Sequence, residues 1–199
     1  IKRALISVSD KKNILVLAKS LQKESVEIIS TGGTLKFLEE AGIEVKDISE
    51  FTGSKEMMNG RVKTLHPKVH AGILSRRNID KNEVKKNSIE EIDLVVVNLY
   101  PFEETVKNNG TFEEAIENID IGGPTMIRAS AKNFYYVSVL SSPNEYESFI
   151  EEFEENKAIS YATRLKLAET AFSNVTKYDL SISDFFENFD KKDLPKSIL

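Results

Sequence analysis

The N-terminal part of the chain alternates between short apolar runs and segments whose apolar residues recur every three or four positions. The apolar runs RALISVSD (3–10), VEIIS (26–30) and IEVKDIS (43–49) predict three strands. Between them, residues 11–24 and 35–42 have the spacing of amphipathic helices. Strands joined to helices by such short connections predict a parallel sheet covered by helices, which is an α/β fold.

The middle of the chain is less regular. Residues 51–78 show no clear period, which predicts a long, loop-rich insertion. The run IDLVVVNLYPF (92–102) gives the strongest predicted strand, broken by a proline near its end. Short helices are expected over residues 102–118, a helix over 122–133, and a last strand at YYVSVL (135–140).

From Pro143 onward the pattern is mainly helical, and residues 161–189 form one long amphipathic segment. The 199 residues suit one domain. We therefore expect a single domain over residues 1–199, in which residues 143–199 are a mainly helical extension.

Composition narrows the class of protein. The net charge of −5 argues against a nucleic-acid partner, because such surfaces carry an excess of basic residues. The chain has no cysteine, which excludes disulfides, thiolate catalysis and cysteine-ligated zinc. No apolar run approaches the roughly 18 residues that span a bilayer, and the first residues lack the apolar core of a secretory signal. We expect a cytoplasmic protein with no membrane partner.

Four polar stretches follow predicted strands and should meet at one edge of the sheet: SVSDK (7–11), STGGT (30–34), NLYPF (98–102) and DIGG (120–123). The glycines of STGGT would let backbone N–H groups approach an anion at the start of a helix. The same letters also fit an ordinary capped helix with a glycine turn.

The stretch NGRVKTLHPKVHAGILSRR (59–77) gathers basic side chains, among them Arg61, Lys63, His66, Lys68 and His70. A solvated basic loop is the simplest interpretation. A zinc helix is disfavoured, because the zincin pattern needs Glu directly after the first histidine and Pro67 stands there. We expect no metal.

The stretch IDIGGPTMIRASAKN (119–133) combines an acid, two glycines and a helix that ends in a lysine. Asp120 can cap this helix, and Lys132 can be a surface lysine at its end. Tyr100, before a proline, would usually serve packing. Each residue alone is ambiguous, but their convergence on one edge of the sheet favours a ligand site.

The motifs SVSDK, STGGT, NGRVKTLHPKVHAGIL, NLYPFEETV and DIGGPTMIRASAKN resemble the inosine monophosphate (IMP) cyclohydrolase domain. That domain is the N-terminal half of a bifunctional purine-biosynthesis protein whose other half is an AICAR transformylase. The resemblance implies a methylglyoxal-synthase-like fold, a parallel sheet with helices on both faces. It also implies a purine nucleotide as substrate, a homodimer, and closure of formyl-AICAR to IMP without a metal or other cofactor.

The resemblance further implies roles for individual residues. Catalytic roles fall on Lys132 as the proton-transfer lysine, and on Asp120, Lys63 and Tyr100. The substrate-binding positions are Ser9, Asp10, Lys11, Thr31, Gly32, Gly33, Thr34, Arg61, Val62, Lys63, Thr64, Val97, Asn98, Asp120 and Ile121.

Two departures from the family pattern stand out. Phe134 occupies a position where relatives commonly have histidine, and the chain stops at KKDLPKSIL, where relatives begin the join to the transformylase half. We therefore expect either a one-activity fragment or an unusually short protein. Two rivals remain: a methylglyoxal synthase, whose aspartate–histidine constellation the motifs do not resemble, and a non-catalytic module that senses a nucleotide.

Overall fold

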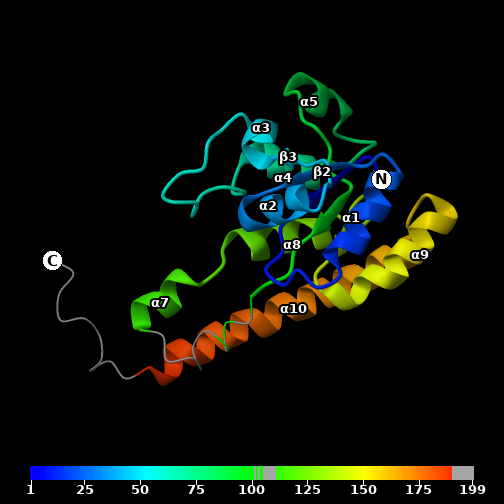
Figure 1. Ribbon diagram of the computed structural model, residues 1–199. Helices are drawn as coiled ribbons and strands as arrows, with labels where there is room; N and C mark the ends of the chain where they lie inside the picture. Colours follow the sequence, from blue (N-terminus) through cyan, green and yellow to red (C-terminus); the bar gives the residue numbers. More distant parts are fainter. Residues whose placement is uncertain (101, 103, 105–110, 190–199) are drawn as a thin grey trace.

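A computed structural model describes residues 1–100, 102, 104 and 111–189 (Figure 1). Its centre is a five-stranded sheet in the order β3-β2-β1-β4-β5, and all neighbouring strands are parallel. The strands are β1 (Arg3–Ile6), β2 (Glu27–Ser30), β3 (Lys46–Asp47), β4 (Leu94–Val96) and β5 (Ser138–Leu140). The predicted parallel α/β sheet is confirmed.

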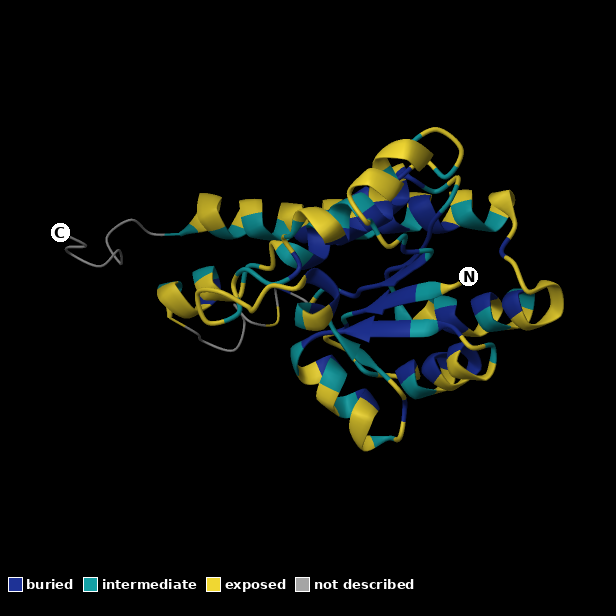
Figure 2. Cartoon of the chain, turned by 90° about the horizontal axis from the view of Figure 1, so that it is seen from above, coloured by how far each residue is buried: buried dark blue, intermediate teal, exposed yellow. Residues whose placement is uncertain are grey.

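The sheet forms the buried centre of the molecule (Figure 2). Leu5, Val95 and Val139 lie in register on the three adjacent strands β1, β4 and β5, and none of them is exposed. Strands covered on both faces need apolar side chains on both faces, which explains their continuous apolar runs.

Two helices follow the first two strands: α1 (Ile14–Lys23) and α2 (Gly32–Glu40). Right-handed crossovers place both on the same face of the sheet. The later helix α9 (Tyr146–Asn156) packs against α1 and so extends this layer.

The opposite face is covered by α8 (Gly122–Lys132), which contacts β4 and β5. Two helices pack against α8, α4 (Pro67–Leu74) and the 28-residue α10 (Tyr161–Asn188), which runs the length of the molecule in Figure 1. Small buried side chains on α10, Ala168 and Ala171, allow its close packing. The long C-terminal helix is confirmed.

Several expected elements differ from the structure. The third strand is limited to Lys46–Asp47 instead of residues 43–49. It ends at Asp47 because the carboxylate of Asp47 accepts a hydrogen bond from the N–H of Ser49 at 2.6 Å and starts α3 (Ile48–Thr52). The expected strand over 92–102 is limited to β4. The expected loop over 51–78 contains α4, which begins at Pro67 and is capped by His66 through its Nδ1.

Other differences concern short helices. STGGT is not a separate turn, because α2 already begins at Gly32. The structure also contains α5 (Lys81–Lys86), α7 (Phe112–Glu117) and a 3₁₀ helix at Pro143–Glu145. α7 lies within the region where short helices were expected, whereas α5 was not expected. The predicted break at residue 101 and the remaining helical turns over 103 and 105–110 lie outside the described residues, as does the tail 190–199.

Candidate functional site

The carboxyl ends of β1, β2 and β4 border a cavity of about 830 Å³. The chain passes from β1 to β2 on one side and places β4 on the other, which is where open parallel sheets usually bind ligands. Many residues predicted to bind substrate line this edge cavity, namely Thr31, Arg61, Val62, Lys63, Thr64, Val97, Asp120 and Ile121. Sequence reasoning missed Met58, Glu117 and Asn118 in its wall, since these belong to no motif.

The start of α2 forms one wall of the edge cavity. Gly32 has a left-handed backbone with φ +53°, which favours glycine. A Cβ at Gly32 would stand 3.4 Å from Nζ of Lys63, so this ammonium lies over the first residue of the helix. Gly33 faces open space, with nothing within 4 Å of a Cβ placed there. A helix N-terminus beside a lysine attracts anions.

The hydroxyl of Thr34, which was expected to bind the ligand, is instead bonded to the backbone of Val8. Its Oγ1 donates to the carbonyl of Val8 at 2.9 Å and accepts from the N–H of Val8 at 3.1 Å. Thr34 is buried, so it fastens the loop after β1 to α2.

The two cations facing the edge cavity are each paired with a carboxylate. Nζ of Lys63 lies 2.7 Å from Oε2 of Glu56. Arg61 binds Glu117 with two hydrogen bonds, of 3.1 Å from Nε and 2.7 Å from Nη2. This second pair joins the loop between α3 and α4, residues 53–66, to α7 across the cavity. An anionic ligand therefore has to compete with these carboxylates.

Asp120 lies directly before Ile121, the N-cap residue of α8, and its side chain caps the helix from that position. Its Oδ1 accepts a hydrogen bond from the N–H of Gly123 at 2.9 Å. A Cβ at Gly123 would overlap the Asp120 carboxylate, and one at Gly122 would stand 2.7 Å from Oγ1 of Thr64. The two glycines therefore allow α8, Asp120 and the 53–66 loop to meet at the cavity.

Asn98 joins the loop after β1 to the end of β4. Its Oδ1 accepts the N–H groups of Ser9 and Asp10 at 2.8 and 2.9 Å, and its Nδ2 donates to the carbonyl of Asp10 at 2.8 Å. Asp10, Asn98 and Tyr100 line a second cavity of about 540 Å³, next to α10. Nζ of Lys11 lies 6.0 Å from the ring centroid of Phe37, a cation–π contact.

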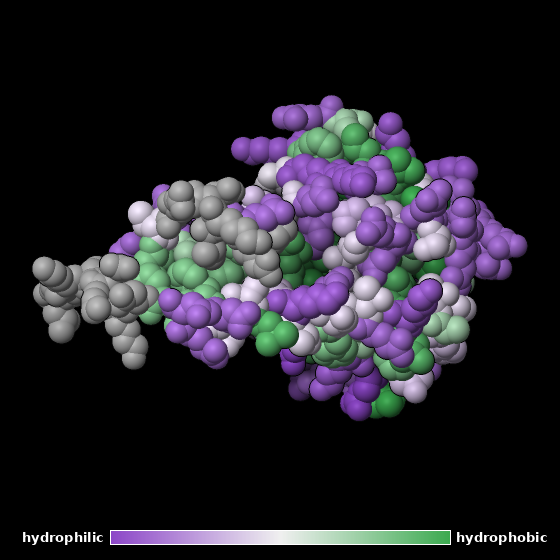
Figure 3. Space-filling model, turned by 90° about the horizontal axis from the view of Figure 1, so that it is seen from below, coloured by the Kyte–Doolittle hydropathy of each residue, from purple (hydrophilic) through white to green (hydrophobic). Residues whose placement is uncertain are grey.

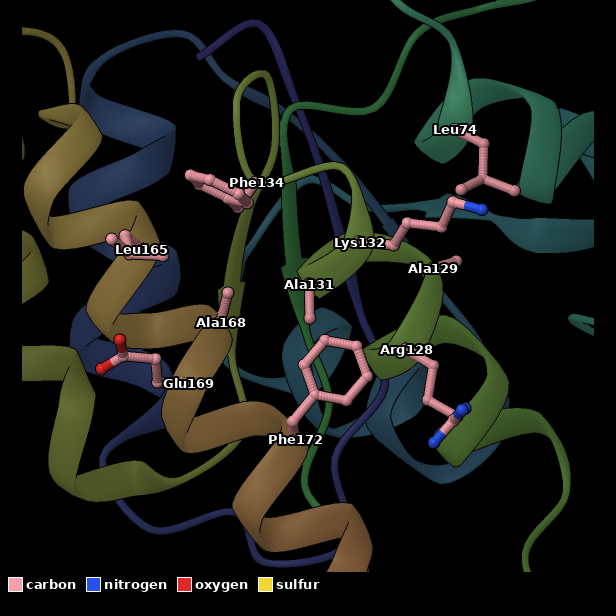
Figure 4. A pocket seen from close by; sticks show the side chains of 10 residues that line it. All are labelled: Leu74, Arg128, Ala129, Ala131, Lys132, Phe134, Leu165, Ala168, Glu169 and Phe172. Atoms are coloured by element: carbon pink, nitrogen blue, oxygen red, sulfur yellow. The ribbon is translucent and has the colours of Figure 1, made fainter.

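Within one chain, Lys132 and Asp120 lie far apart. The two residues lie at opposite ends of α8, a helix of 11 residues, and such a helix is about 16 Å long. Lys132 lines a third, apolar cavity of about 570 Å³ formed by α8, α10 and the end of α4. In Figure 4, Lys132 points toward Leu74, Phe172 projects from α10 toward α8, and Arg128 projects from α8 on the side away from α10, with its guanidinium 5.6 Å from the Phe172 ring centroid.

Neither of the two histidines, His66 and His70, lines the edge cavity. His66 caps α4, and burial lowers the pKa of His70 below its ordinary value of 6.5. In the described part of the chain, no three His, Asp or Glu side chains gather in a group able to hold a metal. Nor does that part contain a helix both long and apolar enough to cross a membrane.

The edge cavity can perform two tasks. The start of α2, with Lys63 and Arg61, can bind a phosphate. The carboxylate of Asp120 can accept a proton from a group bound a short distance away. A phosphorylated small molecule with an acidic N–H is the kind of ligand that suits both.

Comparison with known proteins gives two family matches. Residues 13–125 match the MGS-like domain, and residues 130–199 match a family described as the AICARFT/IMPCHase bienzyme. The first match covers more than half of the chain.

Individual relatives agree with these matches. The bifunctional purine biosynthesis protein PurH of Acetivibrio thermocellus is 50% identical over 202 residues, and that of Clostridium perfringens (strain SM101) is 56% identical over 187 residues. The alignments cover 100% and 92% of this chain but only 39% and 37% of those proteins. The crystal structure of ForH matches with a TM-score of 0.84 and 37% identity, covering 93% of this chain and 98% of ForH.

Proposed function

The chain belongs to the MGS-like domain family, and from this premise we propose that it is an IMP cyclohydrolase, which closes formyl-AICAR to inosine monophosphate. The observation that carries the proposal is the edge cavity, because Thr31, Lys63 and Asp120 line it together. The relatives named PurH support the same reaction, although this chain spans only about two fifths of their length.

In the proposed complex, the nucleotide phosphate lies at the start of α2. The N–H groups of the first helical turn bind its oxygens. Arg61 turns from Glu117 toward the phosphate or the ribose. The base then lies between Val97 and Ile121, next to the Asp120 carboxylate.

The reaction joins two ends of one molecule. The carboxamide nitrogen attacks the formyl carbon, and Asp120 accepts the proton that this nitrogen loses and returns it to the formyl oxygen, which becomes a hydroxyl group. That hydroxyl group then leaves as water together with the proton of the formamide nitrogen, which forms the ring double bond of IMP. Lys63 donates a hydrogen bond to the oxygen while it carries negative charge, whereas Tyr100 lines the second cavity and takes no part in this step. Holding both reacting groups in one cavity supplies much of the rate.

The position of Lys132 leads us to include a homodimer in the proposal. Lys132 is exposed at the far end of α8, so it cannot reach the reacting amide of its own chain without a large movement. The apolar cavity around it, lined by Leu74, Leu165 and Phe172, is a suitable surface for a second copy. In such a dimer, Lys132 transfers a proton in the partner's edge cavity.

The full-length protein is proposed to carry an AICAR transformylase domain, in line with the bienzyme match over residues 130–199. That domain would supply formyl-AICAR to the cavity described above. We also propose a cytoplasmic location, in line with a nucleotide substrate that does not cross membranes unaided.

The function is tested by adding formyl-AICAR to the purified chain and following IMP by its absorbance. The wild-type chain is expected to form IMP, and Asp120→Asn is expected to form it at least a hundredfold more slowly. Calorimetry with IMP separates the rivals. A nucleotide-sensing module would bind IMP without turnover, and a methylglyoxal synthase would do neither. Either result contradicts the proposal.

A further inference from the structure

Tyr178 links the long helix α10 directly to the edge cavity. Its hydroxyl oxygen accepts a hydrogen bond of 2.7 Å from the backbone N–H of Asp120, 58 positions earlier in the chain. Only 7% of Tyr178 is exposed. Residues 161–188 of α10 do not line the edge cavity, so Tyr178 can influence the cavity only through Asp120.

The ring of Tyr178 is held in place by a small apolar cluster. It packs edge-on against Phe102, with ring centroids 6.5 Å apart and planes at 79°, and Phe102 packs in the same way against Phe185. Ala115 of α7 and Ile119 complete the contact on the side of Asp120. The cluster lies at the far end of α10, where Figure 3 shows hydrophobic surface beside the residues drawn in grey.

Two hydrogen bonds hold Asp120, one at its backbone N–H and one at its carboxylate. The hydroxyl of Tyr178 accepts from the Asp120 N–H, and Oδ1 of Asp120 accepts from the N–H of Gly123. The two bonds fix the backbone and the carboxylate of one residue from different elements, α10 and α8. Burial raises the pKa of Tyr178 above its ordinary value of 10, so the phenol stays protonated near neutral pH. It is therefore an uncharged acceptor that adds no repulsion to the carboxylate.

We propose that Tyr178 is a positioning residue for Asp120: its hydroxyl holds the Asp120 backbone so that the carboxylate points into the edge cavity. The inference rests on the proposed function, in which Asp120 accepts the amide proton. Without the hydroxyl, the Asp120 N–H loses this acceptor, and the short segment between α7 and α8 loses its hydrogen bond to α10. A carboxylate displaced by about 1 Å loses much of its value as a base.

The test uses Tyr178→Phe, which removes one oxygen atom and keeps the ring packing. Thr176→Val is the matched control, because it removes an exposed hydroxyl of α10 that donates to the carbonyl of Phe172 within the same helix. In Tyr178→Phe we expect single-turnover cyclisation to fall about tenfold, the value of one ordinary hydrogen bond, with IMP affinity changed less than twofold. We also expect a shift in the acidic limb of the pH–rate profile. Thr176→Val should match the wild type in all three.

A second measurement does not depend on activity. Hydrogen exchange of the Asp120 amide, followed by NMR, should become at least tenfold faster in Tyr178→Phe and stay unchanged in Thr176→Val. If wild-type protein forms no IMP, the proposed function fails, and the exchange rate still decides whether Tyr178 holds Asp120. Unchanged exchange would overturn the inference. So would a lower melting temperature combined with wild-type turnover and pH profile, since Tyr178 would then be purely structural.

Discussion

At the scale of single residues, the two glycines at the start of α2 have different tasks. Gly32 needs its left-handed backbone, so Gly32→Ala should lower the free energy of unfolding by about 1–2 kcal/mol. Gly33 lies in the helix beside open space, so Gly33→Ala should leave stability equal or slightly higher. If the nucleotide phosphate occupies that open space, Gly33→Ala should nevertheless weaken IMP binding about tenfold or more.

Urea unfolding and calorimetry with IMP on the same two variants provide the measurement. A Gly33→Ala variant with wild-type affinity would mean that STGGT is only the start of a helix and that the phosphate binds elsewhere.

Glu117 controls how freely Arg61 can reach a ligand. The two side chains are paired in the structure, and a bound phosphate has to break this pair or bind beside it. Glu117→Gln should therefore raise IMP affinity several-fold at low salt, and the gain should shrink as salt screens the charges. Glu113→Gln removes an equal charge from the opposite end of α7, outside the edge cavity, and should show little change. Equal affinities in all three proteins would show that Arg61 does not contact the nucleotide.

Single-residue roles were predictable from sequence only where a short motif contains them. STGGT, RVKT and DIGG are contiguous, so they indicated the start of α2, the basic loop and the start of α8. Glu117 and Tyr178 were not predictable, because each acts on a residue more than fifty positions away and neither belongs to a motif. Such partners appear only when the sheet order is known.

At the scale of elements, Asn133 fastens the end of α8 to the end of α4. Its Nδ2 donates to the carbonyls of Ile73 and Ser75 at 2.7 and 3.0 Å, and the residue is buried. Asn133→Ala leaves both carbonyls without this donor and should lower the free energy of unfolding by about 2 kcal/mol. Asn156→Ala removes an exposed amide from the end of α9 and should cost far less. Urea denaturation compares the two, and equal losses would contradict the assigned role.

His70 makes the stability of α4 depend on pH. Burial lowers its pKa below 6.5, so the unfolded chain takes up the proton first as the pH falls. The contribution of His70 is therefore complete above pH 6.5 and is lost between 6.5 and its lower folded-state pKa. His70→Phe should flatten the pH dependence of the unfolding free energy in that window. His66→Asn keeps an N-cap and His70, so its pH dependence should retain the slope; an unchanged slope in His70→Phe would contradict the assignment.

Element boundaries were the weaker part of the sequence prediction, for reasons that the caps explain. The third strand ends early because Asp47 starts a helix. α4 was expected to be loop because residues 51–78 show no clear period, and its N-cap, His66, is not a usual one. The long helix α10 was predictable because its apolar spacing persists over many turns. Periodicity identifies long elements, whereas a single hydrogen bond decides where short ones begin.

At the scale of the whole molecule, the order β3-β2-β1-β4-β5 could not be read from the strand sequences, but it decides where the site lies. The same order puts the two ends of α8 in different cavities, with Asp120 at the sheet edge and Lys132 near α10. A motif that looks continuous in sequence is thus divided between two surfaces. If both residues serve one reaction, two chains have to cooperate.

This leads to a complementation experiment with two variants of low activity. Asp120→Asn damages the edge cavity, and Lys132→Met damages only the residue proposed to act in the partner. When the two are co-refolded in equal amounts, half of the dimers are mixed, and each mixed dimer has one cavity with an intact Asp120 that faces an intact Lys132. About a quarter of all sites should therefore regain activity, as measured by IMP formation against a wild-type sample treated in the same way.

The control pair is Asp120→Asn with Lys63→Met. Both residues line the same edge cavity of one chain, so every cavity in a mixed dimer still lacks one of them and no activity should return. Recovery in the first pair alone requires that Lys132 act across the interface, because no single chain in that mixture holds both groups. If the first pair also stays inactive although mixed dimers form, proton transfer belongs to Asp120 or water, and the cavity around Lys132 only packs one helix against another.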